Sequence, residues 1–215
     1  MDAEVFRTWI VAAAEVIEAS RDHLTQLDAA IGDADHGINL SRGFTAVLAA
    51  LRSATPGTPG AILTLTGKTL ISKVGGASGP LYGMAFRRAG HALGDSADAD
   101  LPALAAALEA ALAAVQQLGA AREGDKTMVD ALAPATRAFS KAVAEGAARD
   151  DALAALAQAA AAGADATVPM QAVKGRASYL GPRSVGHQDP GAASTALILG
   201  ALAAAGRDGA PRAPR

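Results

Sequence analysis

The chain contains no cysteine among its 215 residues. This absence excludes a disulfide-stabilised scaffold, a thiolate zinc site, an iron–sulfur cluster and a cysteine nucleophile, so any metal must be held by oxygen or imidazole. Aromatic residues are also scarce, at 3% of the sequence, whereas 58 residues are alanine. An apolar content carried mainly by small, helix-forming side chains predicts an all-helical fold.

The sequence also lacks an excess of either charge, with 19 Lys and Arg against 21 Asp and Glu. Without a basic stripe, binding to nucleic acid or to an anionic membrane surface is not expected. Asp2 and Glu4 stand where a signal peptide needs positive charge. The longest uncharged apolar-rich run, residues 191–205, is shorter than the roughly 20 residues that cross a bilayer. We therefore expect a cytoplasmic protein with no membrane segment.

Apolar periodicity predicts eight helices. Phe6, Ile10, Ala13, Ile17 and Leu24 recur at helical spacing and predict one long helix over residues 4–28. Four later helices are preceded by a capping residue and a proline, in Thr58-Pro59, Ser78-Gly79-Pro80, Asp100-Leu101-Pro102 and Asp189-Pro190. The expected later helices cover residues 39–52, 59–73, 81–93, 102–118, 126–145, 151–163 and 190–205.

These helices predict a single domain over residues 1–206. Residues 207–215 lack apolar anchors and are expected to fray. No stretch alternates with period two over a length that would indicate a sheet.

Three carboxylates, Asp28, Asp33 and Asp35, lie within eight residues at the predicted end of the first helix. Gly32 and Gly37 allow the chain to turn sharply there. Carboxylates so close together repel one another unless a cation lies between them. Hard oxygen donors in this number suit Mg²⁺, which leaves positions for water and for substrate phosphate.

The acidic turn has two other interpretations, an EF-hand loop and a solvated helix cap. An EF-hand loop starting at Asp33 is excluded, because Gly37 occupies the third ligand position and Phe44 the twelfth. In the other, the turn is a solvated acidic cap in which Asp35 or His36 only caps the next helix. Spacing alone leaves the metal site and the solvated cap equally open.

Three further polar segments interrupt the apolar pattern at helix junctions. Residues 75–80 form a glycine-rich loop leading into a helix, which could bind phosphate or could be only a tight turn. Residues 174–191 form a long expected loop in which Arg176 or Arg183 could neutralise phosphate, and His187 is expected to be structural. The third segment is Gly-Asp-Lys-Thr-Met at 124–128.

Taken together, these segments closely resemble the nucleotide-binding L subunit of bacterial dihydroxyacetone kinases, which also occurs fused to a substrate domain. The resemblance runs from Leu27 to the last helix. It is carried by Gly-Asp-Ala-Asp-His-Gly at 32–37, Gly-Gly-Ala-Ser-Gly-Pro at 75–80, Gly-Asp-Lys-Thr-Met at 124–128, Gly-Arg-Ala-Ser-Tyr-Leu-Gly at 175–181 and Gly-His-Gln-Asp-Pro-Gly-Ala at 186–192.

The resemblance implies an eight-helix antiparallel barrel with ADP, or ATP in the charged state, bound at one end. Mg²⁺ ions, expected to be two, would be held by Asp28, Asp33 and Asp35. No side chain is assigned a catalytic role beyond positioning and charge neutralisation. The residues implied to contact the nucleotide are His36, Gly37, Ile38, Asn39, Ala77, Ser78, Gly119, Met128, Arg176, Asp189, Pro190 and Gly191.

The resemblance also implies partners. In the family a separate K subunit holds the triose, and in the phosphotransferase-system type a phosphohistidine donor protein recharges the bound ADP. Ala34 and His36, in a free-standing chain, favour that type. The alternatives are a subunit of an ATP-dependent triose or tetrose kinase and a noncatalytic nucleotide-binding scaffold. The sequence leaves open whether the chain forms a homodimer.

Overall fold

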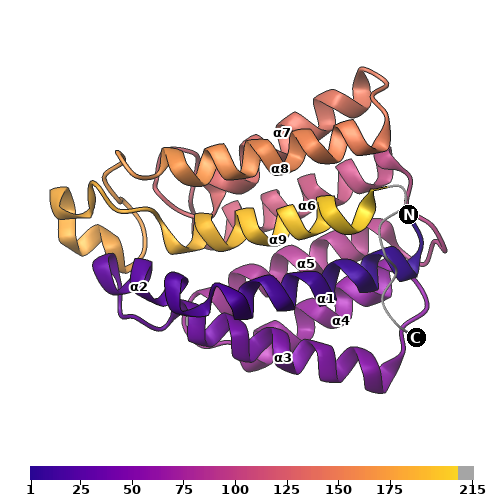
Figure 1. Cartoon of the computed structure of the whole chain (residues 1–215), viewed down its shortest axis with the longest axis horizontal. Coiled ribbons are helices and arrows are strands. Elements are labelled where there is room, and N and C mark those ends of the chain that lie inside the picture. Colours follow the sequence, from indigo (N-terminus) through magenta and orange to yellow (C-terminus); the bar gives the residue numbers. More distant parts are fainter. Residues whose placement is uncertain (208–215) are drawn as a thin grey trace.

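The computed structural model describes residues 1–207, and within that range it is built from helices, with no strand (Figure 1). The prediction of an all-helical fold is confirmed. The helices are α1 (Ala3–Ala19), α2 (Arg21–Ile31), α3 (His36–Ala54), α4 (Pro59–Lys73), α5 (Ser78–Leu93), α6 (Leu101–Gly119), α7 (Val129–Ala144), α8 (Arg149–Ala166), the 3₁₀ helix η1 (Arg176–Ser184) and α9 (Pro190–Gly206). The frayed tail predicted for residues 207–215 lies, from residue 208 onward, outside the described residues.

The helices follow one another up and down the molecule. Each helix from α3 to α8 packs against the next in the chain, and α1 packs against both α3 and α9. Because the direction alternates, α3, α5, α7 and α9 all begin at the end where α2 and η1 lie (Figure 1). The helix contacts thus form a closed ring, in which α1 joins α9 to α3. The barrel shape stays a prediction.

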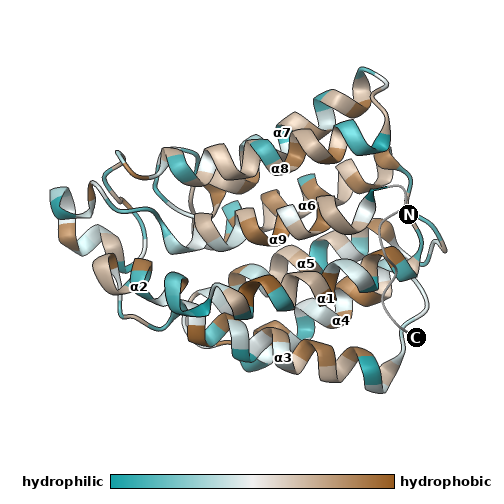
Figure 2. Cartoon of the chain, in the orientation of Figure 1, coloured by the Kyte–Doolittle hydropathy of each residue, from teal (hydrophilic) through white to brown (hydrophobic). Residues whose placement is uncertain are grey.

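The core lies along the length of the bundle and is made of the predicted apolar faces. Phe6, Ile10 and Ile17 of α1 are fully buried. Trp9 packs on Phe86 of α5 and donates its indole N–H to the carbonyl of Ile198 in α9 at 2.9 Å. Figure 2 shows apolar residues along the helices and many hydrophilic residues in the loops at the α2 end. Polar chemistry is therefore concentrated at one end of the bundle.

Helix starts confirm three of the four capping predictions. The side chains of Thr58, Asp100 and Asp189 each accept a hydrogen bond from a backbone N–H in the first turn of α4, α6 and α9. The prediction at the fourth was wrong by three residues, because α5 begins at Ser78 rather than Leu81. Pro80 lies within the first turn of α5. Because N–H groups in a first turn have no acceptor within the helix, the missing N–H of proline costs no helical hydrogen bond there.

Other boundaries also differ from prediction, and α3 begins at His36 rather than at residue 39. The long helix expected over residues 4–28 is divided at Ser20, whose φ of −97° and ψ of 4° leave the helical region. The helix expected from residue 126 begins at Val129, because Lys126 has a φ of +61°. The loop expected over residues 174–191 contains η1.

One helix in the described range, α6, is long and apolar enough to span a membrane by length and composition alone. It packs between α5 and α7, and Leu104, Leu108 and Val115 are buried in the core. Its apolar sequence is explained by this packing.

Candidate functional site

A pocket of about 360 Å³ lies at the α2 end of the bundle. It is formed by the loops before α3, α5, α7 and α9, and by the segment that enters η1. Four helix N-termini therefore converge on it, and each brings backbone N–H groups and the positive end of a helix dipole. Such a pocket is suited to an anion.

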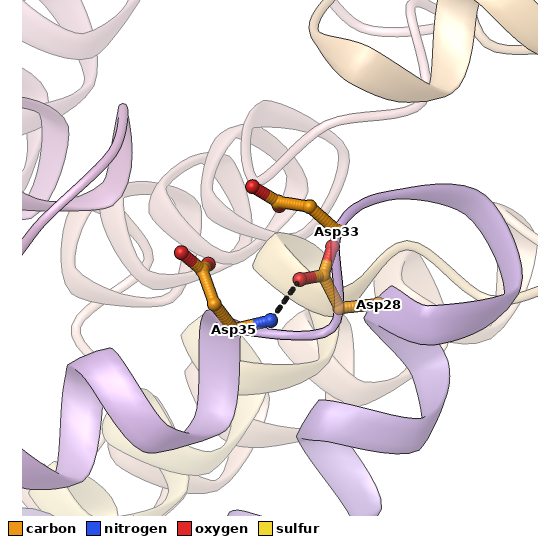
Figure 3. Close-up of side chains that lie close together, drawn as sticks. All are labelled: Asp28, Asp33 and Asp35. Atoms are coloured by element: carbon orange, nitrogen blue, oxygen red, sulfur yellow. Dashed lines mark hydrogen bonds between the residues drawn. The ribbon is translucent and has the colours of Figure 1, made fainter.

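The acidic turn, residues 28–35, forms one wall of the pocket. Its three aspartates each place a carboxylate oxygen within 4.8 Å of the others (Figure 3). Asp28 is buried, Asp35 is half-buried and Asp33 is exposed. Hard oxygen ligands gathered in this way fit Mg²⁺. Asp35 precedes α3 but its side chain makes no capping hydrogen bond, which argues against the solvated cap.

Asp28 also holds the backbone of the acidic turn. Its Oδ2 accepts hydrogen bonds from the backbone N–H groups of Asp35, at 2.9 Å (Figure 3), and of His36, at 3.1 Å. A Cβ at Gly32 would lie 2.0 Å from Asp28 Oδ1, so only glycine fits beside this carboxylate. The turn is therefore shaped by Asp28 before any ligand binds.

A buried hydrogen-bond network lies behind the acidic turn. His36 Nδ1 lies 3.1 Å from Ser78 Oγ in α5, and its Nε2 lies 2.8 Å from Ser194 Oγ in α9. Ser194 Oγ is 2.7 Å from the hydroxyl of Tyr82, which also contacts Thr195 Oγ1. Burial lowers the pKa of His36, opposed by the charges of Asp28 and Asp35. The network links the starts of α3, α5 and α9 through the imidazole of His36.

The segment that enters η1 carries an arginine close to the carboxylates. Arg176, at the start of η1, places Nη2 3.0 Å from Asp33 Oδ2. Its side chain is 70% exposed, so the guanidinium remains accessible from the pocket. Arg183, the other cation expected near phosphate, is exposed on η1 and is not among the pocket-lining residues. Of these two cations, Arg176 is the one at the site.

Most predicted nucleotide contacts line this pocket, but three do not. Gly37, Ile38 and Asn39 lie in the first turn of α3, outside the lining. A Cβ at Gly37 would lie 2.0 Å from the carbonyl oxygen of Arg21, so this glycine allows α2 and α3 to approach closely. The predicted contacts in the lining are His36, Ala77, Ser78, Gly119, Met128, Arg176, Asp189, Pro190 and Gly191.

The apolar side of the pocket is formed by Leu81, Val115 and Met128, beside Gly119. A Cβ at Gly119 would lie 3.4 Å from Leu81, in ordinary contact. These side chains offer a flat organic group a surface away from the carboxylates. The pocket thus combines an acidic, an amide-rich and an apolar region, as a nucleotide with bound metal requires.

Sequence reasoning missed one residue of the site, Lys126, and gave no sign of the perturbed pKa of Asp189, which it had predicted as a helix cap and a nucleotide contact. Lys126 is 1% exposed and donates only to backbone carbonyls. Asp189 caps α9, and burial raises its pKa to about 7, with the nearby Asp130 adding to the rise. The Gly-Asp-Lys-Thr-Met motif marked the place of Lys126 but gave no sign of its partners.

Comparison with known proteins defines the class. Residues 30–204 match the DAK2 domain, and the chain belongs to this family. It is 40% identical over 200 residues to the "PEP-dependent dihydroxyacetone kinase, ADP-binding subunit DhaL" of Escherichia coli K12, covering 93% of this chain and 95% of that protein. It is 38% identical over 194 residues to the "PTS-dependent dihydroxyacetone kinase, ADP-binding subunit DhaL" of Lactococcus lactis, covering 90% and 93%.

A solved structure agrees with this assignment. The dihydroxyacetone kinase of C. freundii in complex with AMP-PNP and Mg²⁺ matches with a TM-score of 0.70 and 30% identity. The match covers 94% of this chain but 34% of that one. The chain therefore matches about a third of the length of the C. freundii kinase.

Proposed function

We propose that this chain is the ADP-binding subunit of a phosphoenolpyruvate-dependent dihydroxyacetone kinase. It passes a phosphoryl group from its bound nucleotide to dihydroxyacetone held on a separate K subunit. The observation that carries this proposal is the convergence of the three aspartates of the acidic turn with four helix N-termini on one pocket. Relatives that match over nearly their whole length bear that name.

Asp28, Asp33 and Asp35 would hold Mg²⁺, which we propose to be two ions. When bound, Mg²⁺ neutralises phosphate charge and orients the phosphate oxygens. Residues 75–78, at the start of α5, line the pocket and would bind phosphate oxygens through backbone N–H groups. Arg176 adds an exposed positive charge beside Asp33. Phosphoryl transfer depends mainly on such positioning and charge stabilisation.

The base of the nucleotide lies against the apolar side of the pocket, between Gly119 and Met128. With the phosphates at the acidic turn, the transferable group faces the open end of the bundle. A K subunit docked there brings the triose to it. We propose that a phosphohistidine protein recharges the ADP in place, and that the complex works in the cytoplasm.

Nucleotide retention tests this proposal. A nucleotide held by metal, helix N-termini and an apolar pocket leaves only when several contacts break together, so it dissociates slowly. Protein purified in Mg²⁺ without added nucleotide should carry ADP through gel filtration and lose it to a chelator. Because Trp9, Tyr82 and Tyr179 are the only strong near-ultraviolet chromophores, bound adenine should dominate the absorbance spectrum.

The second half of the test concerns the phosphate source. The loaded chain should phosphorylate dihydroxyacetone only when the K subunit and a phosphohistidine donor are both present. Repeated turnover on ATP with the K subunit alone would instead identify an ATP-dependent triose or tetrose kinase. Nucleotide binding without transfer in either mixture would identify a noncatalytic scaffold.

A further inference from the structure

Lys126 is a buried lysine whose partners are all backbone carbonyls. Its Nζ donates to the carbonyl oxygens of Thr167 at 2.9 Å, Met170 at 3.1 Å and Ser184 at 2.8 Å, and also to that of His187. An ammonium has three N–H donors, so four acceptors share them. The carbonyls form a cage around a single positive charge.

The backbone at Lys126 shows that the side chain is needed there. Its φ of +61° is a left-handed conformation that glycine or asparagine adopts more readily. A lysine is disfavoured in this conformation, which persists only where the surrounding structure compensates. The four hydrogen bonds of the ammonium supply that compensation.

The four carbonyls belong to one segment, which we call the strap, residues 167–189. Thr167 and Met170 follow α8, Ser184 ends η1, and His187 lies just before the cap of α9. Lys126 is separated from them by 41 to 61 residues in the chain. One ammonium therefore fixes both ends of the strap against the turn that precedes α7.

The strap carries part of the pocket. Arg176 lies at its middle and Asp189 at its end, and both line the pocket. Among the other described ties of the strap, Arg176 forms an ion pair with Asp33 at 3.0 Å, and Val173 N–H donates to the carbonyl of Asp125 at 3.2 Å. Loss of the ammonium would leave four carbonyls facing one another with no donor among them.

A lysine in a glycine-containing turn at a nucleotide site could instead bind phosphate directly. The geometry argues against this for Lys126, because its ammonium is directed at the carbonyls of the strap and its side chain is almost fully buried. Desolvation lowers its pKa, and the charge of Asp189 opposes that effect. The charge acts on the protein rather than on a ligand.

We propose that Lys126 is a positioning residue, an internal cation that holds the strap, and with it Arg176 and the Asp189–Gly191 turn, against the bound nucleotide. This inference deepens the proposed function and rests on it for its effect on nucleotide binding. Its effect on the strap itself does not depend on that function.

The absence of native cysteine permits a direct test. Lys126→Cys is alkylated in denaturant and refolded, either with 2-bromoethylamine, which restores an ammonium at nearly the same distance, or with 1-bromopropane, which gives an uncharged side chain of the same length. Lys141→Cys, on an exposed position of α7, receives both treatments as the matched control. Hydrogen exchange of residues 167–188 is measured without nucleotide, and Mg²⁺-dependent ADP affinity by calorimetry.

The propyl adduct at position 126 should lose exchange protection in the strap and bind ADP about tenfold more weakly or worse, since small displacements of binding groups have large effects. The ethylammonium adduct should restore both, and the two Lys141→Cys adducts should behave alike. Equal strap protection and equal ADP affinity in the two adducts at position 126 would overturn the proposal. A wild-type chain that binds no ADP refutes the proposed function, while strap exchange still decides the role of Lys126.

If the propyl adduct does not refold, Lys126→Gly replaces it, because glycine suits the φ of +61°. The cavity left by the side chain has the shape of n-butylammonium. Recovery of strap protection with n-butylammonium but not with n-butanol supports the proposal. Wild-type protection and ADP affinity in Lys126→Gly without any amine refute it.

Discussion

The acidic turn and the strap are neighbouring segments that line one pocket and meet where Ile31 packs against Ala172 and Ala177, and each is held by a buried charged side chain. In the acidic turn, the carboxylate of Asp28 accepts from two backbone N–H groups. In the strap, the ammonium of Lys126 donates to four backbone carbonyls. A charge is used in both because charged hydrogen bonds are about twice as strong as neutral ones.

The two segments differ in the sequence separation between the charged side chain and the backbone groups that it contacts. Asp28 contacts backbone seven and eight residues away, whereas Lys126 contacts backbone 41 to 61 residues away. The acidic turn is therefore a local structure that two neighbouring helices position. The strap depends on the packing of α7, α8 and α9. We expect changes in distant packing to disturb the strap and spare the acidic turn.

The largest effect is expected at the metal ligands. Asp33→Asn or Asp35→Asn should abolish Mg²⁺-dependent ADP binding, because each removes one of three convergent carboxylates. The helical fold should remain, since neither side chain supports the backbone as Asp28 does. Calorimetry and far-ultraviolet circular dichroism measure the two properties.

Asp95→Asn, which changes an exposed aspartate after α5, is the matched control and should bind ADP normally. Asp28→Asn should lose both ADP binding and thermal stability, because it also weakens the bonds to the N–H groups of Asp35 and His36. Unchanged ADP affinity in Asp33→Asn and Asp35→Asn would refute the metal assignment.

A smaller effect is expected where α8 meets α7. A Cβ at Gly163 would lie 2.2 Å from the carbonyl oxygen of Asp130 and 2.9 Å from Pro134. Gly163→Ala should therefore move α8 outward and destabilise the fold by about 1–3 kcal/mol. Because the strap begins at the end of α8, its hydrogen exchange should rise while that of residues 28–35 stays unchanged.

Gly200→Ala in α9 is the control for this change, since a Cβ there meets nothing within 4 Å. It should stabilise the protein by roughly 0.5–1 kcal/mol through the lower chain entropy of alanine. Urea unfolding measures both variants. If Gly163→Ala accelerates hydrogen exchange equally in the acidic turn and the strap, the expectation that distant packing supports only the strap is wrong.

The same distinction explains what could be predicted from the sequence. The convergence of Asp28, Asp33 and Asp35 was predictable because their spacing is short and a turn must bring them together. The cage around Lys126 was not, because its acceptors are backbone atoms of distant residues and leave no residue-type signature. The 3₁₀ helix η1 was missed for a related reason, since Gly181 and Pro182 within it are typical of loops.

Apolar periodicity predicted the helices well but not all of their ends. It continues through Ser20 because α1 and α2 both turn their apolar faces to the core, so the break is invisible in the pattern. The start of α7 was placed too early because Lys126 is a good helix former. Its left-handed backbone is set by the tertiary cage.

A pH dependence is also expected in the strap. Burial raises the pKa of Asp189 to about 7 from an ordinary value of 3.8, opposed by its hydrogen bond from the Ala192 N–H and by the charge of Lys126. Between these two pKa values the folded protein keeps a proton that the unfolded chain has released. The contribution of Asp189 to the free energy of unfolding therefore falls as pH rises from about 4 to about 7, and is constant outside that window.

Asp189→Asn removes this titration while keeping an oxygen that can cap α9. The free energy of unfolding of the wild type, minus that of Asp189→Asn, should decrease steadily across the window, as measured by urea titration at several pH values. In the propyl adduct at position 126 the decrease should extend to higher pH, because the opposing charge of Lys126 is gone. A difference that stays flat, or one that rises with pH, would show that Asp189 is ionised in the folded strap. The end of the strap would then carry a negative charge near the Lys126 ammonium, in place of the single positive charge that distinguishes the strap from the acidic turn.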